Sequence, residues 1–443
     1  MSLNRKAMVL AVGAALAPCA YAQVTSPAGT NWEFYGKFYP EMTHSHGEGA
    51  TDPSQPVSDQ STLVKPKAGN AVIPRWEMQT SNTYIGFRGD KQIGRGSKAI
   101  WQLEQSVNID EGIVTDNSSG ASPSFANRNS FVGLTKAEWG TVRLGNMDTP
   151  FKNYGNVVGF LGVNSGNFVT PSNVKDKAGF GTSSSSSFNL RRPNAIDLAS
   201  PTILGGLQSA AQYSIGNPSE DQITTSPKRF PRVASWAVKW EKGPLYLGLM
   251  QEAHFDLFGG SNQFKAASST TTVDPVTGVA TVKATAVSPL RNTEDPSVNS
   301  KDTANQVVVV YKVGVHSFEA DFTTKKYSES NAPTGKFQEY KNTSYMLLME
   351  NRWTNAWRTA FSYVKAGAGT CSLSGGASCS TSGLEGSQIS AGVAYYLDPS
   401  AYLFGLVGKL KNGSAATYSN LASQKPNPGE DITQIAVGLA YTF

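Results

Sequence analysis

Residues 432–443, ITQIAVGLAYTF, alternate between two kinds of side chain. From Ile435 onward every second residue is large and apolar, and the residues between are small or polar. A period of two is typical of a β-strand whose two faces meet different surroundings. The aromatic residues Tyr441 and Phe443 at its end suit an apolar outer surface that crosses a membrane interface. An ordinary buried edge strand would show the same alternation, so this stretch alone leaves both interpretations open.

The amino-terminal residues have the pattern of a secretory signal. Arg5 and Lys6 precede an apolar run over residues 7–17, which is too short to span a bilayer. A small-x-small motif ends at Ala22. We therefore predict a signal peptide over residues 1–22 and one mature domain over residues 23–443. Cys19 allows a lipoprotein interpretation, but Pro18 directly before it argues against lipid attachment.

Composition excludes some partner classes. The net charge of +5 falls to +3 when Arg5 and Lys6 are removed, and no long basic run follows, so nucleic acid is not an expected partner. A mean hydropathy of −0.30 would by itself indicate a soluble secreted protein. In a β-barrel, however, polar lumen-facing residues alternate with apolar lipid-facing ones, so the mean hydropathy stays low. The 43 glycines and 17 tyrosines suit many turns and aromatic girdles.

Sixteen alternating segments can be counted from residue 31 onward. They span residues 31–42, 77–90, 97–109, 128–136, 141–148, 191–200, 207–216, 232–241, 245–256, 305–313, 316–328, 338–350, 356–367, 387–397, 401–410 and 432–443. The connections between them alternate, a tight turn and then a long polar stretch, as periplasmic turns and external loops do in membrane barrels. We therefore predict an all-β protein, a transmembrane antiparallel up-and-down β-barrel of 16 strands. The predicted external loops include residues 43–75, 257–303 and 368–386.

Five motifs carry a family resemblance. They are YIGFRG at 84–89, GSKAIWQLE at 96–104, RNSFVGL at 128–134, GTVRLGN at 140–146 and RRPNAI at 191–196. Together they resemble the general porins of Gram-negative bacteria, particularly the β-proteobacterial type. The resemblance implies a homotrimer in the outer membrane and a third external loop, here residues 149–189, that folds into the lumen and narrows it. It also implies that the last strand, with Tyr441 and Phe443, is an assembly signal for the barrel-assembly machinery.

Alternation predicts which arginines point into the lumen. Arg88, Arg128, Arg143 and Arg191 each have the parity opposite to an apolar residue of their own segment, which for Arg128 is Phe131. Guanidinium groups gathered on one wall attract anions and raise their local concentration. We therefore expect these four arginines to line an anion path at the constriction.

Four further residues complete the candidate site. Tyr84 stands where the family usually carries a basic residue, and Lys152 lies in a predicted constriction loop that is poor in acids. Asp148 lies just before that loop, and Glu104 belongs to a neighbouring strand. An alternative interpretation is that the arginines only solvate the interior, paired with Glu104 or Asp197.

Four aromatic residues of the predicted constriction loop allow two roles. Phe151, Tyr154, Phe160 and Phe168 could offer a surface for aromatic solutes, or they could pack the loop against the wall. The sequence favours packing.

Cys371 and Cys379 are the only cysteines beyond residue 22. In an oxidising compartment we expect them to form a disulfide that closes a short loop. A metal site is the weaker alternative because no histidine lies near them, and no metal or cofactor is predicted.

The predicted function is passive diffusion of small hydrophilic solutes and inorganic anions through the outer membrane. The alternative is a channel specific for an organic acid, with aromatic acids included. An enzyme is not expected, because none of the histidines His44, His46, His254 and His316 lies near a nucleophile motif and no G-x-S-x-G occurs.

Overall fold

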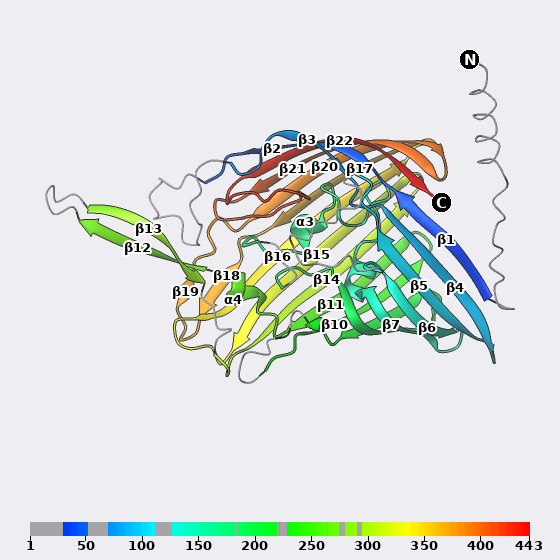
Figure 1. The fold of residues 1–443 in the computed structure, drawn as a ribbon, viewed down its shortest axis with the longest axis horizontal. Helices are drawn as coiled ribbons and strands as arrows, with labels where there is room; N and C mark the ends of the chain where they lie inside the picture. Colours follow the sequence, from blue (N-terminus) through cyan, green and yellow to red (C-terminus); the bar gives the residue numbers. More distant parts are fainter. Residues whose placement is uncertain are drawn as a thin grey trace, which may run out of the picture.

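The fold is a closed barrel of antiparallel strands (Figure 1). The computed structural model describes residues 30–51, 70–110, 126–181, 185–218, 221, 228–263, 265–273, 280–289 and 295–443. The predicted signal peptide over residues 1–22 lies outside these ranges. The barrel wall has 16 positions, here called staves, and each is occupied by one strand or by two consecutive short strands. This confirms the predicted fold class.

Fourteen staves are single strands. They are β5 (Ser97–Ser106), β6 (Ser130–Lys136), β7 (Gly140–Asp148), β8 (Arg191–Ala199), β9 (Leu207–Ser214), β10 (Arg232–Lys242), β11 (Leu245–Phe255), β14 (Asn299–Val313), β15 (His316–Ser330), β16 (Phe337–Arg352), β17 (Trp357–Ala366), β20 (Gly386–Asp398), β21 (Ala401–Asn412) and β22 (Asp431–Thr442). The first two staves are each split, into β1 (Thr30–Phe38) with β2 (Glu41–Glu48), and β3 (Arg75–Gln79) with β4 (Tyr84–Gly94).

The barrel closes between its first and last staves. Pro40 separates β1 from β2, because proline has no N–H to donate to a ladder. β1 pairs with β4 over its length, whereas β2 pairs with β22 on one side and β3 on the other. The last residue completes the seam, since Phe443 N–H donates to the Gly36 carbonyl at 3.1 Å and Gly36 N–H donates back at 3.0 Å.

Apolar side chains lie on the outside of the barrel. On β15, Phe318 and Phe322 are 41% and 50% exposed, whereas Glu319 and Lys325 between and beyond them are 2% and 1% exposed. A soluble protein would bury the first pair and expose the second. The outer surface is therefore suited to lipid, and the polar face is enclosed.

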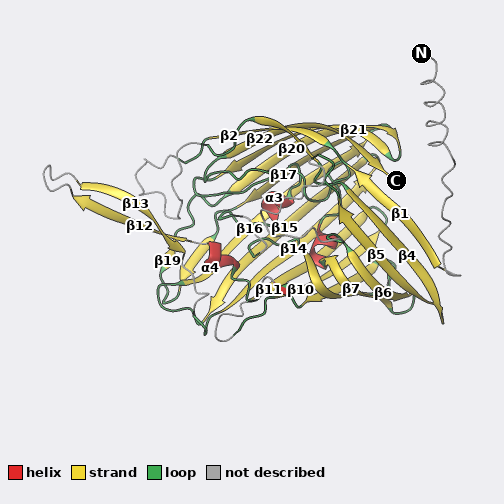
Figure 2. Ribbon diagram, viewed as in Figure 1, coloured by secondary structure: helices red, strands yellow, loops and turns green. Residues whose placement is uncertain are grey.

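In the part of the chain that the structure describes, helices are few and short (Figure 2). They are α2 (Pro150–Gly155), α3 (Ser172–Lys175) and α4 (Gly259–Gln263). Among the described residues, no helix has the length and apolar character needed to cross a bilayer.

Two predicted loop boundaries change in the structure. Thr43 to Glu48 belong to β2 and not to the predicted loop 43–75, because this segment alternates polar inward residues with His44 and His46 and so lacks an apolar period. β14 begins at Asn299, inside the predicted loop 257–303, for the same reason. The rest of that loop contains α4 and a separate hairpin, β12 (Lys265–Val273) with β13 (Ala280–Pro289), which projects beyond the barrel (Figure 1).

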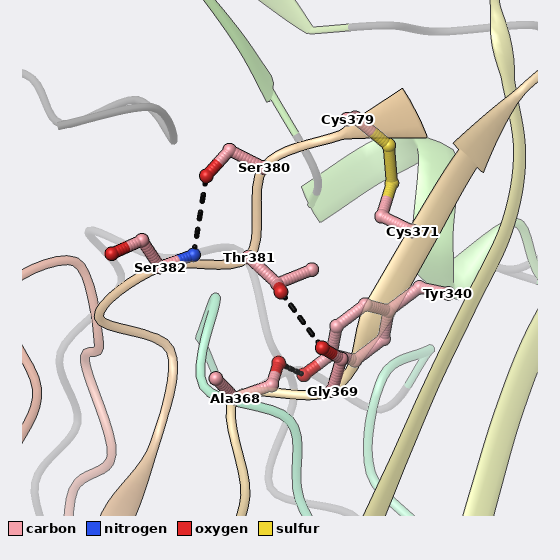
Figure 3. Close-up of a disulfide and its surroundings, with 8 residues drawn as sticks. All are labelled: Tyr340, Ala368, Gly369, Cys371, Cys379, Ser380, Thr381 and Ser382. Atoms are coloured by element: carbon pink, nitrogen blue, oxygen red, sulfur yellow. Dashed lines mark hydrogen bonds between the residues drawn. A yellow bond between two sulfur atoms is a disulfide. The ribbon is translucent and has the colours of Figure 1, made fainter. Parts of the chain in front are cut away.

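The predicted loop 368–386 contains two short strands, β18 (Thr370–Leu373) and β19 (Ser378–Cys379). They pair with each other, and a disulfide joins Cys371 to Cys379 across them (Figure 3). A hydrogen bond from Tyr340 to the Ala368 carbonyl holds the start of this excursion against β16, and one from Thr381 to the Gly369 carbonyl joins its two ends (Figure 3). The excursion is therefore fixed at its base as well as across its strands.

Candidate functional site

Residues 149–189, here called the inner segment, contact side chains of the enclosed face. Its first helix, α2, begins with Thr149 as N-cap and Pro150 at the first turn, a typical helix start. The Thr149 hydroxyl donates to Glu252 of β11, and Phe151 N–H donates to Ser235 of β10 at 3.0 Å. The start of the segment is therefore anchored to two neighbouring staves.

Carboxylates of β15 and β16 hold the middle of the inner segment. Glu319 accepts hydrogen bonds from the backbone of Val157 and Val158, and Glu350 accepts one from Leu161 at 3.2 Å. Asp321 pairs with Lys175 of α3, and both side chains are almost fully buried. These carboxylates therefore anchor the inner segment to β15 and β16.

Burial also shifts the pKa values of the charged residues at and just after the end of α3. Burial alone would lower the pKa of Lys175, but the negative charges of Asp176 and Asp321 outweigh it and raise the pKa. Burial raises the pKa of Asp176, although Lys175 opposes the shift. Burial lowers the pKa of Lys177 to about 8, with Asp176 opposing. Lys175 therefore stays charged, whereas Lys177 titrates near neutrality.

Aromatic residues of the inner segment are mostly packing residues, as the sequence favoured. Phe151, Phe160 and Phe168 are all buried. Phe160 and Phe168 join a cluster with Tyr402 and neighbouring residues of β21. Of the four aromatic residues singled out in the sequence, Tyr154 alone keeps a partly exposed ring. The segment is thus held by apolar contacts as well as by charges.

Basic side chains gather on the enclosed face of β1, β4, β7 and β8, directly before β6, and on α2. We call this set the basic wall, and it consists of Lys37, Arg88, Arg128, Arg143, Lys152 and Arg191. Hydrogen bonds through Asn129 connect part of it, since Asn129 accepts from Arg191 at 3.0 Å and donates to Asp148 at 3.2 Å.

Most members of the basic wall form ion pairs. Arg88 pairs with Glu33, Arg128 with Glu104 at 2.6 Å and Arg143 with Asp197 at 2.6 Å. Arg191 and Lys152 share Asp148, at 3.0 and 3.1 Å. Burial lowers the pKa of Lys152, and Asp148 opposes that shift. The pairing of arginines with Glu104 and Asp197, which the sequence left open, is present.

The basic partner in these pairs is nearer to water than the acidic one. The Arg128 side chain is 23% exposed against 8% for Glu104, and that of Arg143 is 26% exposed against 1% for Asp197. In both pairs the guanidinium group is therefore more exposed to solvent than the carboxylate is.

Arg128 lies on the enclosed face for a reason other than the predicted one. Phe131 does not face outward: Val132 is the exposed residue, and the Arg143 guanidinium lies 5.3 Å from the Phe131 ring. Arg128 precedes β6, where the chain is a bend and strand parity does not apply. Its direction is set by the Glu104 carboxylate.

Aromatic rings lie beside the cations. Arg128 sits 4.7 Å from the centre of the Tyr84 ring, and Arg88 sits 4.6 Å from that of Tyr35. Tyr35 also donates to Glu104 at 3.0 Å. Tyr84 therefore supplies a surface for a cation where the family usually supplies a cation.

Sequence reasoning missed Lys37, which belongs to the same face. Its ammonium donates to the Gly162 carbonyl of the inner segment at 3.0 Å and lies 4.7 Å from the centre of the Tyr39 ring. The signal was available, because Lys37 has the parity opposite to Phe34 and Phe38. His254 was also missed as a packing residue: it stacks on Phe188 at 4.7 Å and so fixes the end of the inner segment.

The predicted assembly residues lie on the outside of the seam. The Phe443 ring packs against Phe34 at 5.3 Å and Phe38 at 5.4 Å, and Tyr441 lies 5.8 Å from it. Gly36 leaves room for this ring, since a Cβ there would lie 2.6 Å from it. These contacts place an aromatic cluster at one end of the barrel's outer surface.

Solved structures of bacterial outer membrane proteins have the same fold. The anion-selective porin from Comamonas acidovorans aligns with a TM-score of 0.63 and 17% identity, over 94% of this chain and all of that one. The trimer form of OmpT from Vibrio cholerae aligns with a TM-score of 0.56 and 12% identity, again over 94% of this chain and all of that one. At these identities the likeness concerns the fold alone.

Curated relatives match over short stretches. Major outer membrane protein P.IB of Neisseria gonorrhoeae is 38% identical over 79 residues, which is 18% of this chain and 20% of that protein. Major outer membrane protein P.IA of Neisseria meningitidis serogroup C is 35% identical over 98 residues, 22% of this chain and 23% of that protein. The chain thus aligns with only about a fifth of the length of these relatives.

A profile of the Gram-negative porin family matches residues 7–415, nearly the whole chain. The family and the fold indicate a channel rather than an enzyme. The protein therefore belongs to the Gram-negative porin family and is a β-barrel of the bacterial outer membrane.

Proposed function

We propose that this protein forms a water-filled channel for passive diffusion of small hydrophilic solutes and that it prefers anions. The inner segment, residues 149–189, is proposed to fold into the lumen and to narrow it opposite the basic wall. Its hydrogen bonds to enclosed-face residues from β1 to β21 support this placement.

One observation carries the anion preference: most of the accessible charges at the site are basic, and Glu33 is the one well-exposed carboxylate among the four that pair with them. The basic wall has six cations against the four carboxylates Glu33, Glu104, Asp148 and Asp197. Three of these four carboxylates are nearly covered. Glu319 and Asp321 of β15 and Glu350 of β16 are buried and bond to the inner segment. In a narrow, low-dielectric passage this arrangement raises the local anion concentration.

The test is the reversal potential in a planar bilayer with a tenfold KCl gradient. We expect the sign for chloride preference, a smaller potential in Arg143→Gln and a larger one in Asp197→Asn. Lys326→Gln is the matched control, because Lys326 has the outward parity on β15 next to the enclosed Lys325. A potassium-selective potential would reject the anion preference, and a lack of conductance would reject the channel.

A second candidate is a channel specific for an organic acid. The rings of Tyr35, Tyr84 and Phe131 beside the arginines favour it, because they offer apolar surface next to positive charge. Saturation of uptake at low concentration of one carboxylate would support this candidate over simple diffusion.

We also propose a homotrimer, assembled into the outer membrane by the barrel-assembly machinery through the strand that ends in Tyr441 and Phe443. The family membership and the OmpT structure described as a trimer form support the trimer. Cross-linking of the protein in outer-membrane vesicles, followed by gel electrophoresis, tests it.

A further inference from the structure

Lys37 differs from the rest of the basic wall. The other five members each form an ion pair, whereas no carboxylate among the described residues lies within ion-pair distance of the Lys37 ammonium. Its contacts are the Gly162 carbonyl and the Tyr39 ring. Both are neutral groups, so the positive charge of Lys37 is left uncompensated by its immediate neighbours.

Tyr84 lies between Lys37 and a second cation. Lys37 and Tyr84 are directly opposite each other on β1 and β4, a geometry that brings their side chains onto the same face. The Arg128 guanidinium lies 4.7 Å from the Tyr84 ring centre, and the Tyr35 ring meets Tyr84 edge-on at 6.3 Å. Lys37, Tyr84 and Arg128 are all partly exposed, so a solute in the lumen can reach them.

Glu104 balances the charge of Arg128 and leaves that of Lys37 unbalanced. Its two carboxylate oxygens are already engaged, one by Arg128 at 2.6 Å and the other by the Tyr35 hydroxyl at 3.0 Å. The other ring-cation pair of β1 and β4, Arg88 with Tyr35, has its guanidinium held by Glu33. The surplus charge and an accessible aromatic ring therefore coincide at Lys37 and Tyr84.

We propose that Lys37, Arg128 and Tyr84 form a binding subsite for aromatic carboxylates, an inference that rests on the proposed anion channel. The carboxylate of the solute would accept hydrogen bonds from the Lys37 ammonium and meet the field of Arg128. Its ring would pack against Tyr84 in the tilted or edge-on geometry that aromatic pairs prefer. An aliphatic acid of equal charge and size would gain only the first of these contacts.

The experiment measures block of the chloride current through single channels by benzoate and by cyclohexanecarboxylate. These two anions have the same charge and nearly the same size, but only benzoate has an aromatic ring. We expect half-block by benzoate at a concentration roughly three- to tenfold lower, the range that an aromatic pair supplies. Tyr84→Leu should abolish this difference and Tyr84→Phe should keep it.

Lys37→Met should weaken block by both acids about tenfold, whereas Lys37→Arg should retain it. Lys326→Met, on the outward face, is the control for a general change in surface charge. Equal block by the two acids in the wild type, or a benzoate preference that survives Tyr84→Leu, would overturn the subsite. A wild-type channel without chloride preference would instead overturn the proposed function, so the two failures are distinguishable.

Discussion

The buried pair between Lys175 and Asp321 gives the sharpest test of how the inner segment is held. Their side chains are 1% and 0% exposed, and the pair joins α3 to β15. Removing one partner from such a pair leaves an uncompensated buried charge and costs about 3–5 kcal/mol. Because Asp176 and Glu319 also act on Lys175, we expect Asp321→Ala to cost about 3 kcal/mol, the lower end of that range.

The two charges are coupled, so the double variant is the decisive measurement. Lys175→Met should also cost about 3 kcal/mol, since it leaves Asp321 buried without its cation. The double variant removes both charges at once, and Asp176 keeps Lys325 as a neighbouring cation. We therefore expect the double variant to cost about 3 kcal/mol, well below the roughly 6 kcal/mol that additive effects would give.

The assay is urea unfolding of the protein in lipid vesicles, with the free energy taken from linear extrapolation. Lys326→Met is the matched control, because Lys326 pairs with Glu339 at an exposed site and such pairs contribute less than about 1 kcal/mol. Additive losses in the double variant, or a loss in the control as large as in Asp321→Ala, would refute the reasoning. Single-channel recordings should show larger current fluctuations in Asp321→Ala than in the control.

Three further predictions concern charge, the seam and the disulfide. The pKa of about 8 at Lys177 means that its ammonium loses its proton as the pH rises from 7 to 9. Its contribution to the proposed chloride preference should disappear over that range, so Lys177→Met should show a smaller fall than the wild type in reversal-potential measurements. Gly36→Val should displace the C-terminal phenyl ring and reduce the folded fraction, measured by gel electrophoresis of unheated samples. Gly405→Ala, where a Cβ has ordinary contacts at 3.9 Å, should fold like the wild type. Reduction of the Cys371–Cys379 bond, which closes a separation of 8 residues, should release about 2.5 kcal/mol of chain-entropy constraint. We expect faster cleavage of residues 368–386 by proteinase K and a free energy of unfolding in urea that is lower by at most that amount, and unchanged cleavage would contradict this role of the disulfide.

Much of the pore-facing chemistry could be predicted from alternation alone. Arg88, Arg143 and Arg191 lie within strands whose apolar residues mark the outer face, so their inward direction follows from a period of two. Arg128 shows where this reasoning ends. It stands outside a strand, and its direction depends on Glu104, a residue 24 positions away along the chain.

Only the tertiary structure shows which groups the charged residues pair with. The surplus charge of Lys37 is visible only because β1 brings it opposite Tyr84 of β4 and because Glu104 is already engaged by two donors. The anchoring of the inner segment by Glu319 and Asp321 likewise joins residues about 150 positions apart in sequence. No local pattern in the chain encodes such pairs.

The sequence by itself determined the class of fold, the number of staves and the outer face of most strands, because a membrane barrel repeats one local rule, alternation, along its strands. β6 is the exception, since Val132 and not Phe131 lies on its outer face. The tertiary structure decided which of the inward charges remain available to a solute. That outcome depends on distances across the closed barrel and on a segment of some forty residues packed against its polar face. Local periodicity carries no information about either, since both arise only when the first and last strands meet.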